Sequence, residues 1–203
     1  MKNHNFYISI NDQNWLDKAL KKISDDGVVV LRGIINDDDM QILKKKVDNV
    51  LSQPSVLGSV GYYQKDPYRK FYDGFLLGRE VINVFVSEII INFIETYLIG
   101  EVVINEIFLK NDLGNNLLYL PYHRHTGVGL ENISQKPFGC GIALYIHDTE
   151  EGAFCYSIGS HNLNLEDKID NIEDHPLKEN LMNNLNRING DAGDVIIFDE
   201  RGF

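Results

Sequence analysis

The chain has 203 residues, of which 43% are hydrophobic and 24% charged. This length and composition predict one globular domain spanning residues 1–203 and exclude a disordered or fibrous chain. The formal net charge of −11, from 30 acidic and 19 basic residues, argues against a nucleic-acid partner, which would require a basic face.

Targeting and redox features are sparse. The longest apolar run, around Ile89–Ile91, is interrupted by Glu88 and Asn92, so we expect no membrane partner. The first residues lack the apolar core of a signal peptide. Cys140 and Cys155 are too few for a disulfide framework and predict reduced thiols in a cytoplasmic protein.

The N-terminal half has helical periodicity around one buried strand. Apolar residues share one helical face over residues 14–24, and a continuous apolar strand is expected over 28–31. Asn36 is expected to cap the next helix, and the strongest helical pattern runs from Arg79 to Leu98. The aromatic and basic stretch 62–78 is expected to be irregular or short-stranded. Its residues 62–72 either line an entrance for an anionic substrate or pack as a surface loop.

The C-terminal half changes to the periodicity of strands. Short β-like runs are expected over residues 102–110, 117–125, 138–146, 153–158 and 194–198. The polar stretch 162–189 is expected to be a surface excursion with a short helix over 177–185. Helices followed by a run of strands predict an α+β domain, mainly β, whose β part is a sandwich or barrel.

Two histidines, His123 and His125, form the most informative motif. They lie two positions apart on an expected strand, so the pleat directs both imidazoles to the same face. Imidazole nitrogens bind zinc and non-haem iron, and such a pair predicts a metal site. The competing interpretation is a pair of hydrogen-bonded structural histidines.

The other four histidines differ in their surroundings. His161 follows Gly159-Ser160 in an expected turn, where it is either a third metal ligand or a structural residue. His4 and His175 are expected at the surface, and His147 is expected in a turn at a strand end. The residues alone therefore leave open a three-imidazole site with an open coordination position.

Several motifs in order along the chain resemble the phytanoyl-CoA dioxygenase family. They are Asp26–Gly33, Tyr122–His125, Leu144–Asp148, Glu151–His161 and Ala192–Gly202. The resemblance implies a double-stranded β-helix (a cupin-like jelly roll) with flanking N-terminal helices. It also implies an oxidoreductase that binds Fe(II), uses 2-oxoglutarate as co-substrate and hydroxylates a small-molecule substrate.

The sequence departs from this family at two places. His123 matches the first metal ligand, but His125 stands where the family has an aspartate. The family's distal histidine follows the stretch that matches Phe198–Phe203, and the arginine that binds 2-oxoglutarate comes later still. Both positions lie beyond Phe203, so we expect a domain that is incomplete at its C-terminus. We also expect the strand at 194–198 to be left as an exposed edge.

Three hypotheses remain. The first is an Fe(II)- and 2-oxoglutarate-dependent dioxygenase. The second is a catalytically degenerate binding protein with the same fold, because His125 replaces the carboxylate. The third is a metal enzyme that uses His123, His125 and His161 without 2-oxoglutarate. In the resembling family the histidine that matches His161 belongs to a turn and is not a metal ligand.

Overall fold

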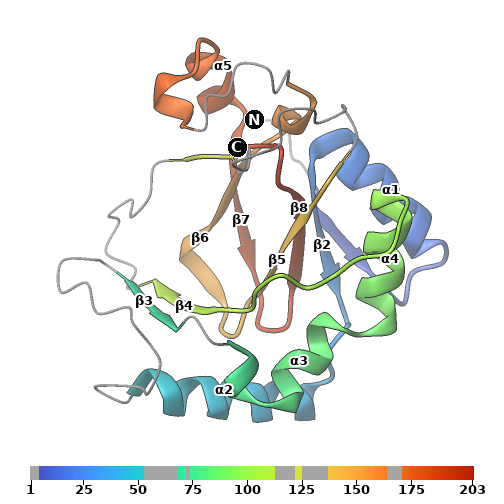
Figure 1. Ribbon diagram of the computed structural model, residues 1–203, viewed down its shortest axis with the longest axis vertical. Coiled ribbons are helices and arrows are strands. Elements are labelled where there is room, and N and C mark those ends of the chain that lie inside the picture. Colours follow the sequence, from blue (N-terminus) through green and yellow to red (C-terminus); the bar gives the residue numbers. More distant parts are fainter. Residues whose placement is uncertain (1–4, 53–67, 72–73, 113–121, 125–136, 164–170) are drawn as a thin grey trace.

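The computed structural model describes residues 5–52, 68–71, 74–112, 122–124, 137–163 and 171–203. Four N-terminal helices lie along the right and lower sides of a set of strands, and a fifth, near the C-terminal end, lies apart from them at the top (Figure 1). The helices are α1 (Trp15–Asp26), α2 (Asp37–Ser52), α3 (Arg79–Phe85), α4 (Glu88–Leu98) and α5 (Lys178–Asn183). The strands are β1 (Tyr7–Ser9), β2 (Val28–Arg32), β3 (Tyr68–Phe71), β4 (Leu109–Asp112), β5 (Cys140–Leu144), β6 (Thr149–Ser157), β7 (Leu185–Gly190) and β8 (Val195–Asp199).

A four-stranded sheet in the order β1-β2-β8-β5 forms the centre of the structure. Strands β1 and β2 are parallel, whereas β8 runs antiparallel to both of its neighbours. Residue Val28 pairs with Phe198, and Leu144 pairs with Val195. The expected exposed edge at 194–198 is therefore wrong, because β8 has a hydrogen-bonded strand on each side.

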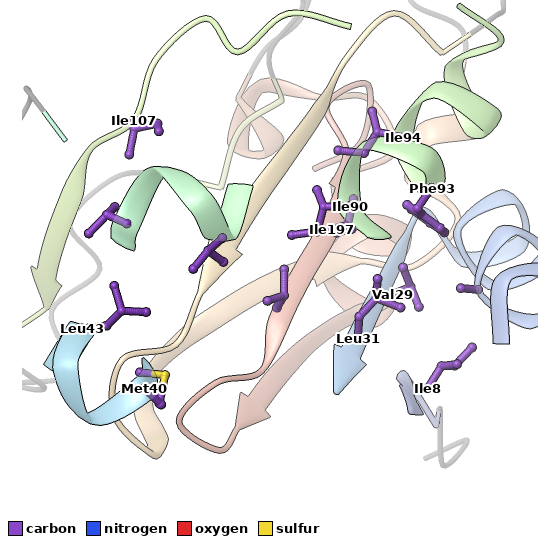
Figure 2. Close-up of a cluster of buried hydrophobic side chains, with 14 of the residues drawn as sticks. Ile8, Val29, Leu31, Met40, Leu43, Ile90, Phe93, Ile94, Ile107 and Ile197 are labelled. Carbon is purple, nitrogen blue, oxygen red and sulfur yellow. The ribbon is translucent and has the colours of Figure 1, made fainter. Parts of the chain in front are cut away.

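One face of this sheet packs against the helices. Val29 and Leu31 of β2, with Val195 and Ile197 of β8, join a cluster that includes buried side chains of the four N-terminal helices. Figure 2 shows Ile90, Phe93 and Ile94 of α4 facing these strands. The cluster excludes water from the helical side of the sheet, which is a main source of its stability.

The opposite face packs against a second, two-stranded sheet formed by β6 and β7. Val28, Val30 and Ile196 point to this side, where they meet Tyr156 of β6 and Ile188 of β7. Since both faces of β2 and β8 are buried, their sequences are continuous apolar runs without polar alternation. The two clusters place the central sheet between a helical layer and the β6–β7 layer.

The helix boundaries follow local sequence signals. Gly27 ends α1 with a φ of 84°, a left-handed conformation that glycine adopts without a steric penalty. The Asn36 side-chain oxygen accepts a 2.8 Å hydrogen bond from the Asp39 N–H, which confirms it as the cap of α2. The expected helix over 79–98 is divided in two, because Ser87 has an extended backbone with φ −60° and ψ 142°.

The segment Arg79–Leu98 contains an 18-residue window with a mean hydropathy of 1.5 and is by length and composition apolar enough to cross a membrane. Its second helix, α4, has one face buried in the helical cluster: Ile90, Phe93, Ile94 and Tyr97. Core helices share this combination of apolar composition and burial.

Two further expectations need correction. Residues 102–108 form no strand, and Val103 exposes 91% of its surface; only Leu109–Asp112 pair, with β3. The stretch 162–189 is not simply a surface excursion. It contains fully buried Ile172 and Ile188 and most of strand β7. Its polar composition concealed the strand, because few of its side chains are buried.

Candidate functional site

The segment Tyr122–Arg124 lies beside a short 3-10 turn, Ile172–Asp174. His123 forms an antiparallel bridge with Asn171, and the Ile172 N–H donates a 2.8 Å hydrogen bond to the Tyr122 carbonyl. Tyr122 packs against a third apolar cluster, made of Ile172, Leu181 and Phe203 with Leu163. The alternation of side chains along a strand, extended to this isolated bridge, would put the His123 imidazole on the opposite side from Tyr122 and Arg124.

Arg124, the central residue of the His123–His125 motif, is almost completely buried, with 2% of its surface exposed. Its guanidinium carbon lies 5.0 Å from the centre of the Phe203 ring, a cation–π geometry. The His175 ring approaches the same Phe203 ring edge-on at 5.3 Å. This side of the strand is thus filled by packed side chains.

The second member of the predicted metal pair, His125, lies outside the described residues, and so does His4. Within the part of the chain that the structure describes, no three His, Cys, Asp or Glu side chains form a group that could hold a metal ion. Of the predicted pair, the structure therefore places His123 alone.

His161 lies in a 3-10 turn, Ser160–Asn162, that packs against the end of α1. Its Nε2 is 3.0 Å from the Ser24 carbonyl oxygen, so Nε2 carries the proton of the neutral ring. A Cβ on Gly27 would lie 2.5 Å from Nδ1, which places this nitrogen against the turn between α1 and β2. Burial lowers the pKa of His161 below its usual value.

The remaining histidines divide between surface and interior. His147 at the end of β5 is half-exposed, and its Nε2 lies 3.0 Å from the Asp48 carboxylate on α2. The expectation that His175 lies at the surface is wrong, because only 6% of it is exposed. Its Nδ1 accepts a 3.0 Å hydrogen bond from the Leu177 N–H, and its ring packs on Phe203.

A buried ion pair at the end of β8 was not anticipated from the sequence. Asp199 is fully buried, and Arg201 donates to its carboxylate at 2.9 Å through Nε and at 2.6 Å through Nη2. Tyr97 of α4 donates to the same carboxylate at 2.6 Å, and the Tyr156 hydroxyl donates to the Asp199 carbonyl at 2.9 Å. Burial, reinforced by the Asp199 charge, raises the pKa of Tyr97 and of Tyr156.

This ion pair fixes the course of the last residues. Phe203 donates its N–H to the Ser160 hydroxyl at 2.9 Å and accepts a 2.6 Å hydrogen bond from the Ser157 N–H. A Cβ on Gly202 would lie 2.0 Å from the Tyr156 hydroxyl oxygen, so only glycine fits there. Asp199, Gly202 and Phe203 together place the Phe203 ring against Arg124, the residue that follows His123.

The aromatic and basic stretch is only partly described. Residues 68–71 form β3, which pairs with β4, and residues 74–77 form a 3-10 turn whose Phe75 and Leu76 are exposed. Residues 62–67 and 72–73 lie outside the described residues, so the role of this stretch at an entrance stays a prediction.

No family model matches the chain, and no curated protein matches it by sequence. Solved structures, however, share its fold. The non-heme alpha ketoglutarate dependent epimerase SnoN from nogalamycin biosynthesis is 16% identical, with a TM-score of 0.69, over 94% of this chain and 76% of its own. EctD from S. alaskensis with bound Fe is 16% identical, with a TM-score of 0.64, over 91% of this chain and 68% of its own.

A third similar structure is HygX from Streptomyces hygroscopicus with nickel and 2-oxoglutarate bound. It is 15% identical, with a TM-score of 0.60, over 91% of this chain and 78% of its own. SnoN has also been crystallised with Fe3+, alpha ketoglutarate and nogalamycin RO. This chain thus shares its fold with two proteins, SnoN and HygX, that have been crystallised with a metal ion and 2-oxoglutarate (alpha ketoglutarate).

Proposed function

We propose that this chain is a non-haem, Fe(II)- and 2-oxoglutarate-dependent dioxygenase with a jelly-roll domain that hydroxylates a small molecule. The observation that carries the proposal is the fold shared with SnoN, EctD and HygX, in which the His123 backbone is bridged to Asn171. Tyr122 packs on an apolar cluster and Arg124 is buried. Strand-like alternation at this bridge would therefore leave the His123 imidazole on the other side.

The donor chemistry of this segment fits iron. Imidazole is a common iron ligand, and a second histidine two positions along a continuing strand would share the face of His123. His123 and His125 would therefore hold the metal, and the bound iron would supply the oxidising chemistry with 2-oxoglutarate as co-substrate. The protein's own part is to orient both and to exclude water.

The expectation of a small-molecule substrate is supported by two of the similar structures. SnoN is crystallised with nogalamycin RO, and HygX with hygromycin B. The likeness to the phytanoyl-CoA dioxygenase family rests on the sequence motifs alone. For this reason we propose the reaction class and not a particular substrate.

Succinate formation from 2-oxoglutarate under air, together with calorimetric titration of Fe(II) without oxygen, tests this proposal. We expect the full-length natural protein to bind Fe(II) and form succinate, and its His123→Ala variant to lose both properties. His147→Ala is the matched control, because His147 is half-exposed and pairs with Asp48 on the surface. Absence of both Fe(II) binding and succinate from the full-length natural protein would refute the proposal.

A second candidate, a catalytically degenerate binding protein, is favoured by one observation: His125 occupies the position at which the resembling family has a carboxylate. The variant His125→Asp separates the two candidates. Iron binding that appears only in this variant favours the degenerate protein, whereas iron binding by the native chain favours the dioxygenase. The third hypothesis has no observation in its favour, because Nδ1 of His161, the nitrogen that the Nε2–Ser24 bond leaves for a metal, lies against the turn at Gly27.

A further inference from the structure

The buried contact between Arg124 and Phe203 involves the residue next to the candidate metal ligand, His123. Arg124 and Phe203 expose only 2% and 3% of their surfaces, and they come from segments far apart in the sequence. The guanidinium carbon is 5.0 Å from the ring centre. An arginine this deeply buried is unusual, and here it is adjacent to His123.

The Phe203 ring is held rigidly. Its backbone is bonded on both sides, to the Ser160 hydroxyl and to the Ser157 N–H, and the edge of the His175 ring packs against it. Two residues upstream, Arg201 forms the buried ion pair with Asp199. The ring is therefore a fixed surface on which the guanidinium plane can rest.

We propose that Arg124 and Phe203 are positioning residues for the candidate metal site. Their contact determines which face of the strand carries His123. A slip of one residue in the pairing with Asn171 would move every side chain to the opposite face. Such a slip would remove Arg124 from the Phe203 ring and bury the imidazole. The inference rests on the proposed function only in taking His123 as a metal ligand.

The first test is metal binding by full-length variants. Co(II) is the probe, because it takes histidine ligands and its visible spectrum reports its coordination geometry. We expect Phe203→Leu and Arg124→Met to weaken Co(II) binding by about 10- to 100-fold, the usual effect of losing a residue that orients a ligand, and to change the spectrum. Phe203→Tyr, which retains the ring, should restore affinity and spectrum.

The matched control is Phe93→Leu, which also removes a buried ring, from the helical cluster on the far side of the central sheet. It should lower thermal stability while leaving the Co(II) affinity and spectrum unchanged. Equal Co(II) affinity and spectrum in the native chain and Phe203→Leu would overturn the positioning role without touching the proposed function.

A second measurement does not need a metal. The Ile172 amide, bonded to the Tyr122 carbonyl, reports the pairing of the His123 strand through its hydrogen-exchange rate. We expect this rate to rise about tenfold or more in Phe203→Leu and to stay constant in Phe93→Leu. A native chain that binds no Co(II) would contradict the proposed function, and the Ile172 rate would then decide the positioning role alone. An unchanged rate overturns it.

Discussion

The Tyr97 hydroxyl donates a 2.6 Å hydrogen bond to the Asp199 carboxylate, across a separation of 102 residues. This bond joins α4 in the helical layer to the end of β8. The same carboxylate accepts the hydrogen bonds from Arg201, and the segment then runs on to Phe203 behind the His123 strand. The helical layer and the candidate site are thus connected through one buried carboxylate.

We expect Asp199→Asn to lower the free energy of unfolding by about 3–5 kcal/mol, because it leaves the buried Arg201 without its counter-charge. Urea denaturation followed by circular dichroism measures the change. Lys21→Ala is the control, since the exposed Lys21–Asp25 pair should contribute nothing measurable. A loss below about 1 kcal/mol in Asp199→Asn would show that the ion pair does not stabilise this end of β8.

Gly27 and Gly159 provide a matched pair, because both have a left-handed φ, of 84° and 79°. Gly27→Ala should destabilise the protein by about 2–4 kcal/mol, since backbone strain adds to a clash with His161 and Tyr156. The Cβ added by Gly159→Ala would meet no atom within 4 Å, so this variant should lose only about 1–2 kcal/mol of stability, from backbone strain. Thermal or urea unfolding gives both values, and equal losses would contradict the close packing around Gly27.

His161 should make the protein less stable in acid. Burial lowers its pKa in the folded state, whereas in the unfolded chain the value is about 6.5. The stability contributed by the neutral, buried His161 is complete above about pH 6.5. It declines as the pH falls through that value, because the unfolded chain then takes up a proton that the folded protein does not. His161→Gln, which can still donate to the Ser24 carbonyl, should lose stability less steeply below about pH 6.5 in urea titrations. Parallel curves would argue against this assignment.

Tyr145 should make the protein less stable in alkali. Its hydroxyl donates to the Ile188 carbonyl at 2.6 Å and accepts from the Phe154 N–H at 2.9 Å, and burial raises its pKa to about 12. The stability contributed by the neutral Tyr145 hydroxyl is complete below about pH 10, the pKa of tyrosine in the unfolded chain. It is lost as the pH rises toward about 12, the pKa in the folded protein.

Tyr145→Phe should therefore cost about 1–3 kcal/mol near neutral pH, because the Ile188 and Phe154 backbone groups lose their partner. Its stability should also fall less steeply above about pH 10 than that of the native chain. Denaturant unfolding across this range measures both effects. An alkaline slope identical to the native one would assign the titration to Tyr97 and Tyr156 instead, whose pKa values are also raised by burial.

Strands β2 and β8 were predictable to within one residue, because burial on both faces produces continuous apolar sequence. Strand β7 was not, because its six residues LNRING contain one fully buried apolar side chain, Ile188, among polar neighbours. His175 was misplaced for a related reason. Its neighbours are polar, but tertiary packing brings Phe203 over its ring.

At the candidate site, spacing alone predicted that His123 lies on a strand face suited to metal binding. It did not indicate that Arg124 is buried, since an arginine between two histidines is compatible with an exposed strand. The Asp199–Arg201 pair was equally hidden, because Arg201 follows the end of the strand, and the turn after β8 folds its guanidinium back onto the Asp199 carboxylate. Such contacts depend on the fold around them.

The position of β8 between β2 and β5 has a consequence for how the protein is made. During translation β2 leaves the ribosome early, with four residues, Val28–Leu31, that are fully buried in the finished structure. Its antiparallel partner β8 is synthesised only after nearly all of the rest of the sequence. Until then one edge of β2 lacks its partner strand, so completion of the sheet is delayed and the nascent chain is exposed to aggregation.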